Sequence, residues 1–204
     1  MIKYRLWGCV IMIAAALPPL AIGFFGLGIG YFVFGGAVFF KYPKENNENV
    51  NHAMGLWGIF MPGFMQFLAG TYIFLGLTVF TAFRSSPILY MAGLAFTAYG
   101  VHWFALGYNK YKNADTTVDG FMAVGFLWIS IIGAVVFGLG DDVPVMILFI
   151  LLAFVYVSDI PASLVHSPSW ARTKAFFQLV TGTWLMYLTF AATLNFALGY
   201  HLFL

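Results

Sequence analysis

Charged side chains are scarce in this sequence. Only 8% of its 204 residues are Asp, Glu, Lys or Arg, and 62% are hydrophobic, whereas roughly 25% of residues are charged in an average soluble domain. The formal net charge of +2 is too small to indicate a nucleic-acid partner, and the nine basic residues are dispersed in short loops. We therefore expect an integral membrane protein whose main partner is the lipid bilayer.

Residue patterns of catalysis and of cofactor binding are also missing. One cysteine, Cys9, excludes an intrachain disulfide. The histidines are far apart in sequence, at His52, His102, His166 and His201, and none forms a pair with metal-ligand spacing. The stretch GFFGLGIG is followed by aromatic residues instead of a lysine, so it does not indicate a phosphate site. We expect neither an enzyme nor a bound metal or cofactor.

Long apolar segments are what the sequence has in abundance. Six of them reach the roughly 20 residues that a helix needs to cross a bilayer, at residues 20–40, 53–83, 87–108, 119–139, 143–165 and 174–203. The connectors between them are short, and they are polar or marked by Pro and Gly. The sequence therefore predicts an all-α integral membrane protein with one six-helix transmembrane domain over residues 18–204.

The first 17 residues form a separate apolar segment. Lys3 and Arg5 precede an apolar run, in the manner of a signal peptide. Residues 6–17 are too few to cross the bilayer as a helix at about 1.5 Å per residue. We expect an additional short N-terminal helix, packed or re-entrant, that is broken by Pro18 and Pro19.

Basic residues are unequally divided between the two sides of such a bundle. With six crossings, one side holds Lys41, Lys44, Lys110, Lys112, Arg172 and Lys174, and the other holds Lys3, Arg5 and Arg84. The positive-inside rule then places both termini outside the inner (cytoplasmic) cell membrane. If residues 1–17 also crossed, the division would be eight against one with only the C-terminus outside, so the orientation stays open.

The third apolar segment has two different faces when its residues are placed at about 100° each. Small residues cluster on one face, at Gly93, Thr97, Gly100 and Gly107. Tyr99 and His102 lie on the opposite face. Because small residues let helices approach closely in lipid, we expect the first face to pack against a neighbouring helix. The second face lines a lumen or meets another subunit, since a polar ring facing lipid would lack a partner.

Other polar residues inside the spans leave alternatives open. Gln66 lies on a small-residue face, where it either bonds to a neighbouring helix or lines a pore. Gln178 and Thr189 share one side of the last segment, which lines a polar passage unless the threonine bonds back to its own helix. Asp159, shortly before Pro161, is expected at the membrane interface as a cap or turn residue, and the alternative is a proton-relay group.

Three stretches resemble the first three helices of one transporter family. LPPLAIGFFGLG, GIFMPGFMQFLAG and GLAFTAYGVHWFALG occur in the order, and at roughly the spacing, of the acetate uptake transporter family, the succinate-acetate permeases. The later helices are similar mainly in length and glycine placement, so the resemblance covers about residues 18–200. It implies six-helix protomers that assemble as homo-hexamers, each enclosing a narrow path for acetate or succinate with protons.

The resemblance also implies which residues border that path. A hydrophobic constriction would consist of Phe25, Tyr99 and a leucine of the fifth helix, Leu151 or Leu152. The family's signature motif would fall on residues 19–22, which places Pro19 and Leu20 on the path. The remaining candidates for the path are the polar residues Gln66, Thr97, His102, Gln178 and Thr189.

The sequence also departs from the family. The Asn of the signature is missing, and its Gly is Ala21. Acidic residues that the bacterial permeases carry in the second and sixth helices are replaced by apolar residues near Ile73 and Ala192. His102 stands where the permeases usually have an aromatic or small residue.

Three functions are consistent with these features. A channel or transporter for a short monocarboxylate such as acetate is favoured by the resemblance. The missing acids favour a channel for a neutral solute, like the urea and amide channels. The degraded signature favours a non-transporting accessory subunit of a larger membrane complex.

Overall fold

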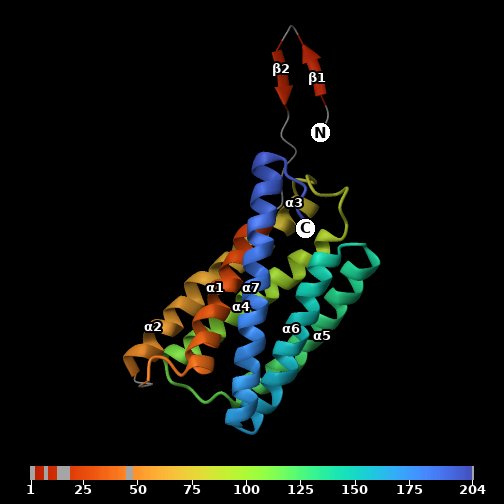
Figure 1. Cartoon of the computed structure of the whole chain (residues 1–204). Helices are drawn as coiled ribbons and strands as arrows, with labels where there is room; N and C mark the ends of the chain where they lie inside the picture. Colours follow the sequence, from red (N-terminus) through yellow and green to blue (C-terminus); the bar gives the residue numbers. More distant parts are fainter. Residues whose placement is uncertain (1–2, 7–8, 13–18, 45–47, 204) are drawn as a thin grey trace.

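The chain forms an all-helical membrane bundle (Figure 1). A computed structural model describes residues 3–6, 9–12, 19–44 and 48–203. Within them, six helical spans are long and apolar enough to cross a membrane, as the sequence predicts. The helices are α1 (Leu20–Phe40), α2 (Glu48–Gly58), η1 (Ile59–Phe64), α3 (Met65–Thr78), α4 (Leu89–Tyr111), α5 (Thr117–Leu139), α6 (Val143–Leu164) and α7 (Pro168–Leu198).

The second span consists of three successive helices, α2, η1 and α3. Its central π-helical turn contains Pro62, which has no backbone N–H to donate. A wider turn accommodates the missing hydrogen bond without ending the span. The span begins at Glu48 rather than at the predicted residue 53, because the first turns of α2 are polar and hydropathy alone does not detect them.

The last helix also differs from the prediction at both ends. It begins at Pro168 instead of residue 174, since the fixed φ of proline suits a first helical turn. It ends at Leu198, where Gly199 adopts a positive φ of 71° and closes the helix. Lys174, the first residue of the predicted segment, therefore lies in the second turn of α7.

The N-terminal segment departs from the expected helix. Lys3–Leu6 (β1) and Cys9–Met12 (β2) are paired as antiparallel strands. The expectation of a helix is wrong for these residues, and the β-branched Val10 and Ile11 suit the extended chain. The rest of the predicted helix, including Pro18, lies outside the described residues.

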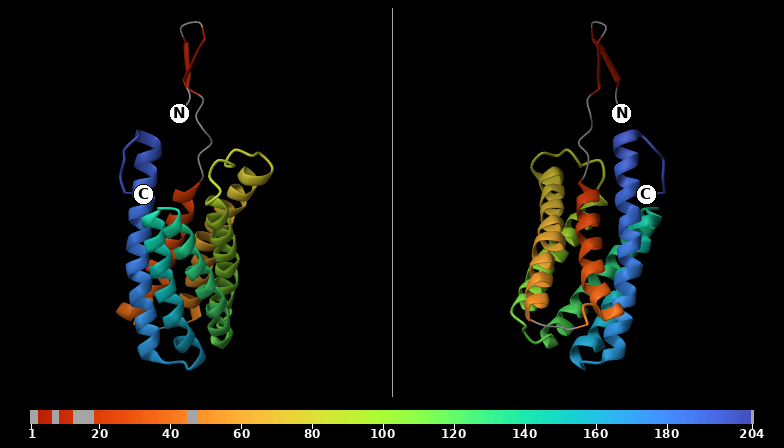
Figure 2. Two further views of the ribbon diagram at one scale, coloured as in Figure 1. Left: turned by 90° about the vertical axis from the view of Figure 1, so that its right-hand side faces the viewer. Right: turned by 60° about the vertical axis from the view of Figure 1, so that its left-hand side comes forward.

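The two ends of the bundle differ in character. The terminal end is where α1 begins and α7 ends (Figure 1). The opposite end, here called the basic end, carries Lys41, Lys44, Lys110, Lys112, Arg172 and Lys174. Helix α1 packs along α7, α5 packs along α6, and α3 packs along α4 (Figure 2).

The glycine face of α4 makes the close contact with the second span. A Cβ atom on Gly100 would lie 2.5 Å from the backbone nitrogen of Phe67, and one on Gly107 would lie 2.7 Å from the Gly55 carbonyl oxygen. The predicted packing of this face is confirmed. The contact turns the opposite face of α4, with Tyr99 and His102, toward the interior of the bundle, where both are buried.

Candidate solute pathway

Two cavities lie inside the protomer. The terminal cavity, near the terminal end, has a volume of about 60 Å³ and an almost wholly apolar wall. The basic-end cavity has a volume of about 380 Å³ and contains most of the buried charge. Tyr99 lines the first cavity, and His102, one turn later on α4, lines the second. The layer around these two residues therefore separates the cavities.

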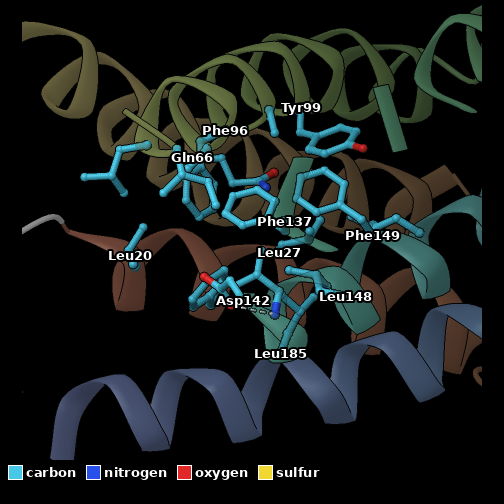
Figure 3. Close-up of a pocket in the computed structure, with 17 residues that line it drawn as sticks. Leu20, Leu27, Gln66, Phe96, Tyr99, Phe137, Asp142, Leu148, Phe149 and Leu185 are labelled. Carbon is cyan, nitrogen blue, oxygen red and sulfur yellow. Dashed lines mark hydrogen bonds between the residues drawn. The ribbon is translucent and has the colours of Figure 1, made fainter. Parts of the chain in front are cut away.

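Leucine and phenylalanine side chains dominate the terminal cavity (Figure 3). Gln66 is the exception: it is fully buried, and neither its amide nitrogen nor its amide oxygen has a hydrogen-bond partner among the described residues. Asp142 lies at the wall and caps α6 by accepting a hydrogen bond from the Val145 N–H at 3.2 Å. Burial raises the pKa of the Asp142 carboxyl, and the Val145 bond opposes the rise.

An ion pair lies in the basic-end cavity. Lys174 Nζ is 2.8 Å from Asp159 Oδ1, and Ser163 Oγ donates to the same oxygen at 2.7 Å. The expectation that Asp159 is a cap or turn residue is wrong. Helix α6 continues through Pro161 to Leu164, so Asp159 lies within the helix and is buried at 5% exposure.

Further polar side chains from α4, α5 and α7 surround this pair. Asn109 Nδ2 lies 3.5 Å from Asp119 Oδ1, while Lys110 and Gln178 line the same cavity. His102 is buried, and its Nδ1 has no hydrogen-bond partner in the described structure. The described residues hold no cluster of three or more His, Cys, Asp or Glu that could bind a metal ion.

Aromatic rings fill the layer between the cavities. Tyr99 stacks on Tyr156 with ring centroids 5.9 Å apart, and on Phe126 at 5.3 Å. The edge of His102 meets Phe126 at 4.4 Å. The Tyr99 hydroxyl lies 3.0 Å from Ser130 Oγ, which itself donates to the Phe126 carbonyl, so Tyr99 is the donor of the first bond. These contacts fix the ring of Tyr99 between the two cavities.

The fold is similar to that of a known channel. No family model matches the sequence, and no curated protein matches it. Among solved structures, the bacterial acetate channel SatP superposes with a TM-score of 0.68 at 17% sequence identity, over 92% of this chain and 97% of that one. At this identity the similarity establishes a shared fold.

The structure separates the predicted constriction residues. Phe25 is 38% exposed and lies on the outside, whereas its neighbour Phe24 is buried and lines the terminal cavity. The placement of Phe25 in a constriction is therefore wrong. Leu152 is buried and lines the cavity, whereas Leu151 is half-buried and does not. Adjacent helical residues point about 100° apart, which accounts for both differences.

The other predicted path residues divide in the same way. Those that line one of the two cavities are Leu20, Gln66, Tyr99, His102 and Gln178. Pro19 lines neither cavity. Thr97 packs against Gly70 in the contact between α3 and α4, which removes it from the path. Thr189 donates to the Leu185 carbonyl of its own helix at 2.8 Å, which is the second of the two predicted alternatives.

Sequence reasoning missed several residues of the basic-end cavity. Tyr31 and Tyr156 line this cavity beside the aromatic layer, and so do the ionisable residues Asp119 and Lys174. The signal that was available is a charge within an apolar span, which in a membrane is costly unless it is paired. Asp119 and Lys174 are the first residues of the predicted segments 119–139 and 174–203, where a charge needs no partner.

Proposed function

We propose that the protein is a membrane channel that conducts a short monocarboxylic acid, such as acetate, through each protomer. One observation carries the proposal: a cavity toward each end of the bundle reaches the aromatic layer around Tyr99, which separates the two. The shared fold with an acetate channel supports the same solute class. Both cavities lie within one chain, which supports conduction through each protomer.

The solute crosses the aromatic layer in its uncharged form. Moving an ionised carboxylate out of water into an apolar space costs far more free energy than moving the neutral acid. None of the described residues that line the terminal cavity is a Lys or Arg that could compensate an anion. Gln66 offers one amide donor and one carbonyl acceptor without partners, and these match the carbonyl and hydroxyl of a carboxylic acid.

A second candidate function follows from the same glutamine. A primary amide or urea also presents a donor beside an acceptor, and it needs no proton to become neutral. Because no described residue that lines the terminal cavity is basic, the cavity suits such a neutral solute as well as it suits a protonated acid. Acetate and urea are therefore the two solutes to compare.

The test is uptake of labelled acetate and labelled urea into proteoliposomes, with protein-free liposomes as the baseline for diffusion through lipid. We expect acetate influx above the baseline and little urea influx. Urea influx without acetate influx would select the neutral-solute channel. No influx of either solute would contradict both functions, and a stable stoichiometric partner in copurification would then favour the accessory role.

Replacing Gln66 by Leu is expected to reduce acetate influx by about tenfold, because the neutral acid loses its hydrogen-bonding partner in a cavity whose wall is otherwise almost wholly apolar. The substitution removes a buried amide without a protein partner, so the fold is retained. The matched control is Gln178→Leu, a glutamine of the basic-end cavity, where water can replace it. Equal influx through both variants would remove Gln66 from the proposed path.

Replacing Phe24 by Ala is expected to increase acetate influx several-fold, because the terminal cavity widens where the ring is lost. Phe25→Ala on the same helix removes an identical ring from the outer surface and should leave influx unchanged. The two variants are compared in the same uptake assay at equal protein content. An increase with Phe25→Ala alone would restore Phe25 to the constriction.

A homo-hexamer remains part of the proposal. Many large apolar side chains are exposed on the outer faces of the helices, including Phe121, Trp128 and Leu139 on α5. Such surfaces suit contact with lipid or with identical subunits. Native mass spectrometry of the purified protein distinguishes a six-fold assembly from a monomer.

A further inference from the structure

The ion pair of the basic-end cavity is unusual in its position. Asp159 and Lys174 face each other within a space of about 380 Å³, and their side chains are 8% and 22% exposed. A purely structural ion pair between two helices is normally enclosed by packed side chains. This pair instead shares its cavity with the solute path proposed above, so a solute that enters from the basic end reaches both partners.

A solute carboxylate would compete with Asp159 for Lys174. The Lys174 ammonium carries three N–H donors, which bind any carboxylate within reach. Asp159 already places one carboxylate oxygen there at 2.8 Å. While Asp159 is ionised, Lys174 is neutralised and the cavity has little attraction for an anion. When Asp159 takes up a proton, Lys174 is left with an uncompensated positive charge.

Other titratable groups share the cavity with this pair. Those of other helices that interact electrostatically with Asp159 are Lys174 of α7, Asp119 of α5, His102 of α4 and Tyr31 of α1. Lys110 and Asp119, which have opposite formal charges, also line the cavity. One proton on Asp159 adds one positive charge to the cavity, which one solute anion neutralises.

We propose that Asp159 and Lys174 form a proton-for-carboxylate exchange site that converts the solute anion to its neutral acid. The inference rests on the proposed function. The solute carboxylate first binds Lys174 while Asp159 is protonated. The Asp159 O–H bond then breaks, and its proton forms an O–H bond with the solute carboxylate. The neutral acid leaves, and the ionised Asp159 returns to Lys174.

The position of His102 fits the next step. It lies one turn from Tyr99 on α4, at the inner wall of the basic-end cavity, and its buried Nδ1 lacks a partner. A neutral acid that leaves Lys174 reaches this nitrogen before the aromatic layer, and its hydroxyl can form a hydrogen bond there. His102 thus acts as a positioning residue between the exchange site and Tyr99.

Acetate binding to the purified full-length protein, followed by saturation-transfer NMR, tests the exchange. In the unsubstituted protein, the Kd for acetate should fall as the pH is lowered from neutrality, because a proton on Asp159 frees Lys174 for the anion. In Asp159→Asn, acetate should bind at least about tenfold more tightly at neutral pH, because Lys174 is permanently free. Lys174→Gln should abolish binding.

Two controls separate this inference from the proposed function. Asp115→Asn replaces an exposed carboxylate near the basic end and should leave the pH dependence unchanged. Tyr99→Trp should block acetate flux but preserve binding at the basic-end cavity. A pH-independent Kd in the unsubstituted protein, or no tightening in Asp159→Asn, overturns the exchange even when acetate flux is observed. If acetate binding depends on pH but no acetate flux is observed, only the proposed channel function is contradicted. If Asp159→Asn fails to fold, the pH dependence of the unsubstituted protein decides alone.

Discussion

Acetate influx should fall to the level of protein-free liposomes when Tyr99 is replaced by Trp. The Tyr99 ring is 2% exposed and stacks on both Tyr156 and Phe126, so a larger indole must extend into the terminal cavity that the ring lines. Packed interiors do not accept additional atoms without shifting their neighbours. Because the ring lies between the two cavities, the added volume closes the proposed path. We expect a loss of at least about tenfold in influx, measured with labelled acetate.

Two matched variants test whether the loss comes from position and size. Tyr108→Trp makes the same change on the same helix at a side chain that is 55% exposed, and it should leave influx unchanged. Tyr99→Phe keeps the ring and removes only the hydrogen bond to Ser130, whose hydroxyl still donates to the Phe126 carbonyl. Its influx should stay near that of the unsubstituted protein. Full influx through Tyr99→Trp would show that the path does not pass this ring.

The number of spans could be predicted because it depends on little more than segment length and hydropathy. The prediction failed at helix ends where polar residues enter a helix. Glu48 begins the second span although the prediction placed it in a connector, and Lys174 lies inside the last helix rather than at its start. A helix that extends beyond the apolar core of the bilayer can carry charge on its last turns, and hydropathy does not record this.

Helical periodicity predicted the two faces of α4 because it fixes relative directions within one helix. The glycines of one face met α2 and α3, and Tyr99 was left facing the interior. Periodicity does not give the absolute rotation of a helix. The aromatic residue of α1 was instead predicted from the family resemblance. That prediction selected Phe25, whereas its neighbour Phe24 lines the cavity.

The pairing of Asp159 with Lys174 could not be predicted from the sequence alone, although a proton-relay role of Asp159 was one of its two interpretations. Asp159 and Lys174 are 15 residues apart and belong to different helices joined by a turn. Their pairing depends on how α6 and α7 are rotated against each other. An acid shortly before a proline usually indicates a helix end, and only the continuation of α6 through Pro161 places the carboxylate inside the bundle.

Replacing Gly100 by Ala is expected to destabilise the protein by about 1–3 kcal/mol, the usual range for overpacking a close contact. The new methyl group would lie 2.5 Å from the Phe67 nitrogen and 2.9 Å from the Gly63 carbonyl oxygen. Both are backbone atoms, which cannot turn away as a flexible side chain can. The helices α3 and α4 must therefore move apart. The free energy of unfolding in detergent micelles, followed by circular dichroism, measures the cost.

Gly125→Ala is the matched control, because a Cβ atom at this position on α5 has no neighbour within 4 Å. It should be neutral or stabilising by up to about 1 kcal/mol, since alanine favours a helix over glycine. Equal stability of the two variants would show that α3 and α4 can separate without cost.

The same contact orients Tyr99 toward the interior, so Gly100→Ala should also reduce acetate influx while Gly125→Ala does not. A variant that loses stability but keeps full influx would uncouple the helix contact from the position of the Tyr99 ring.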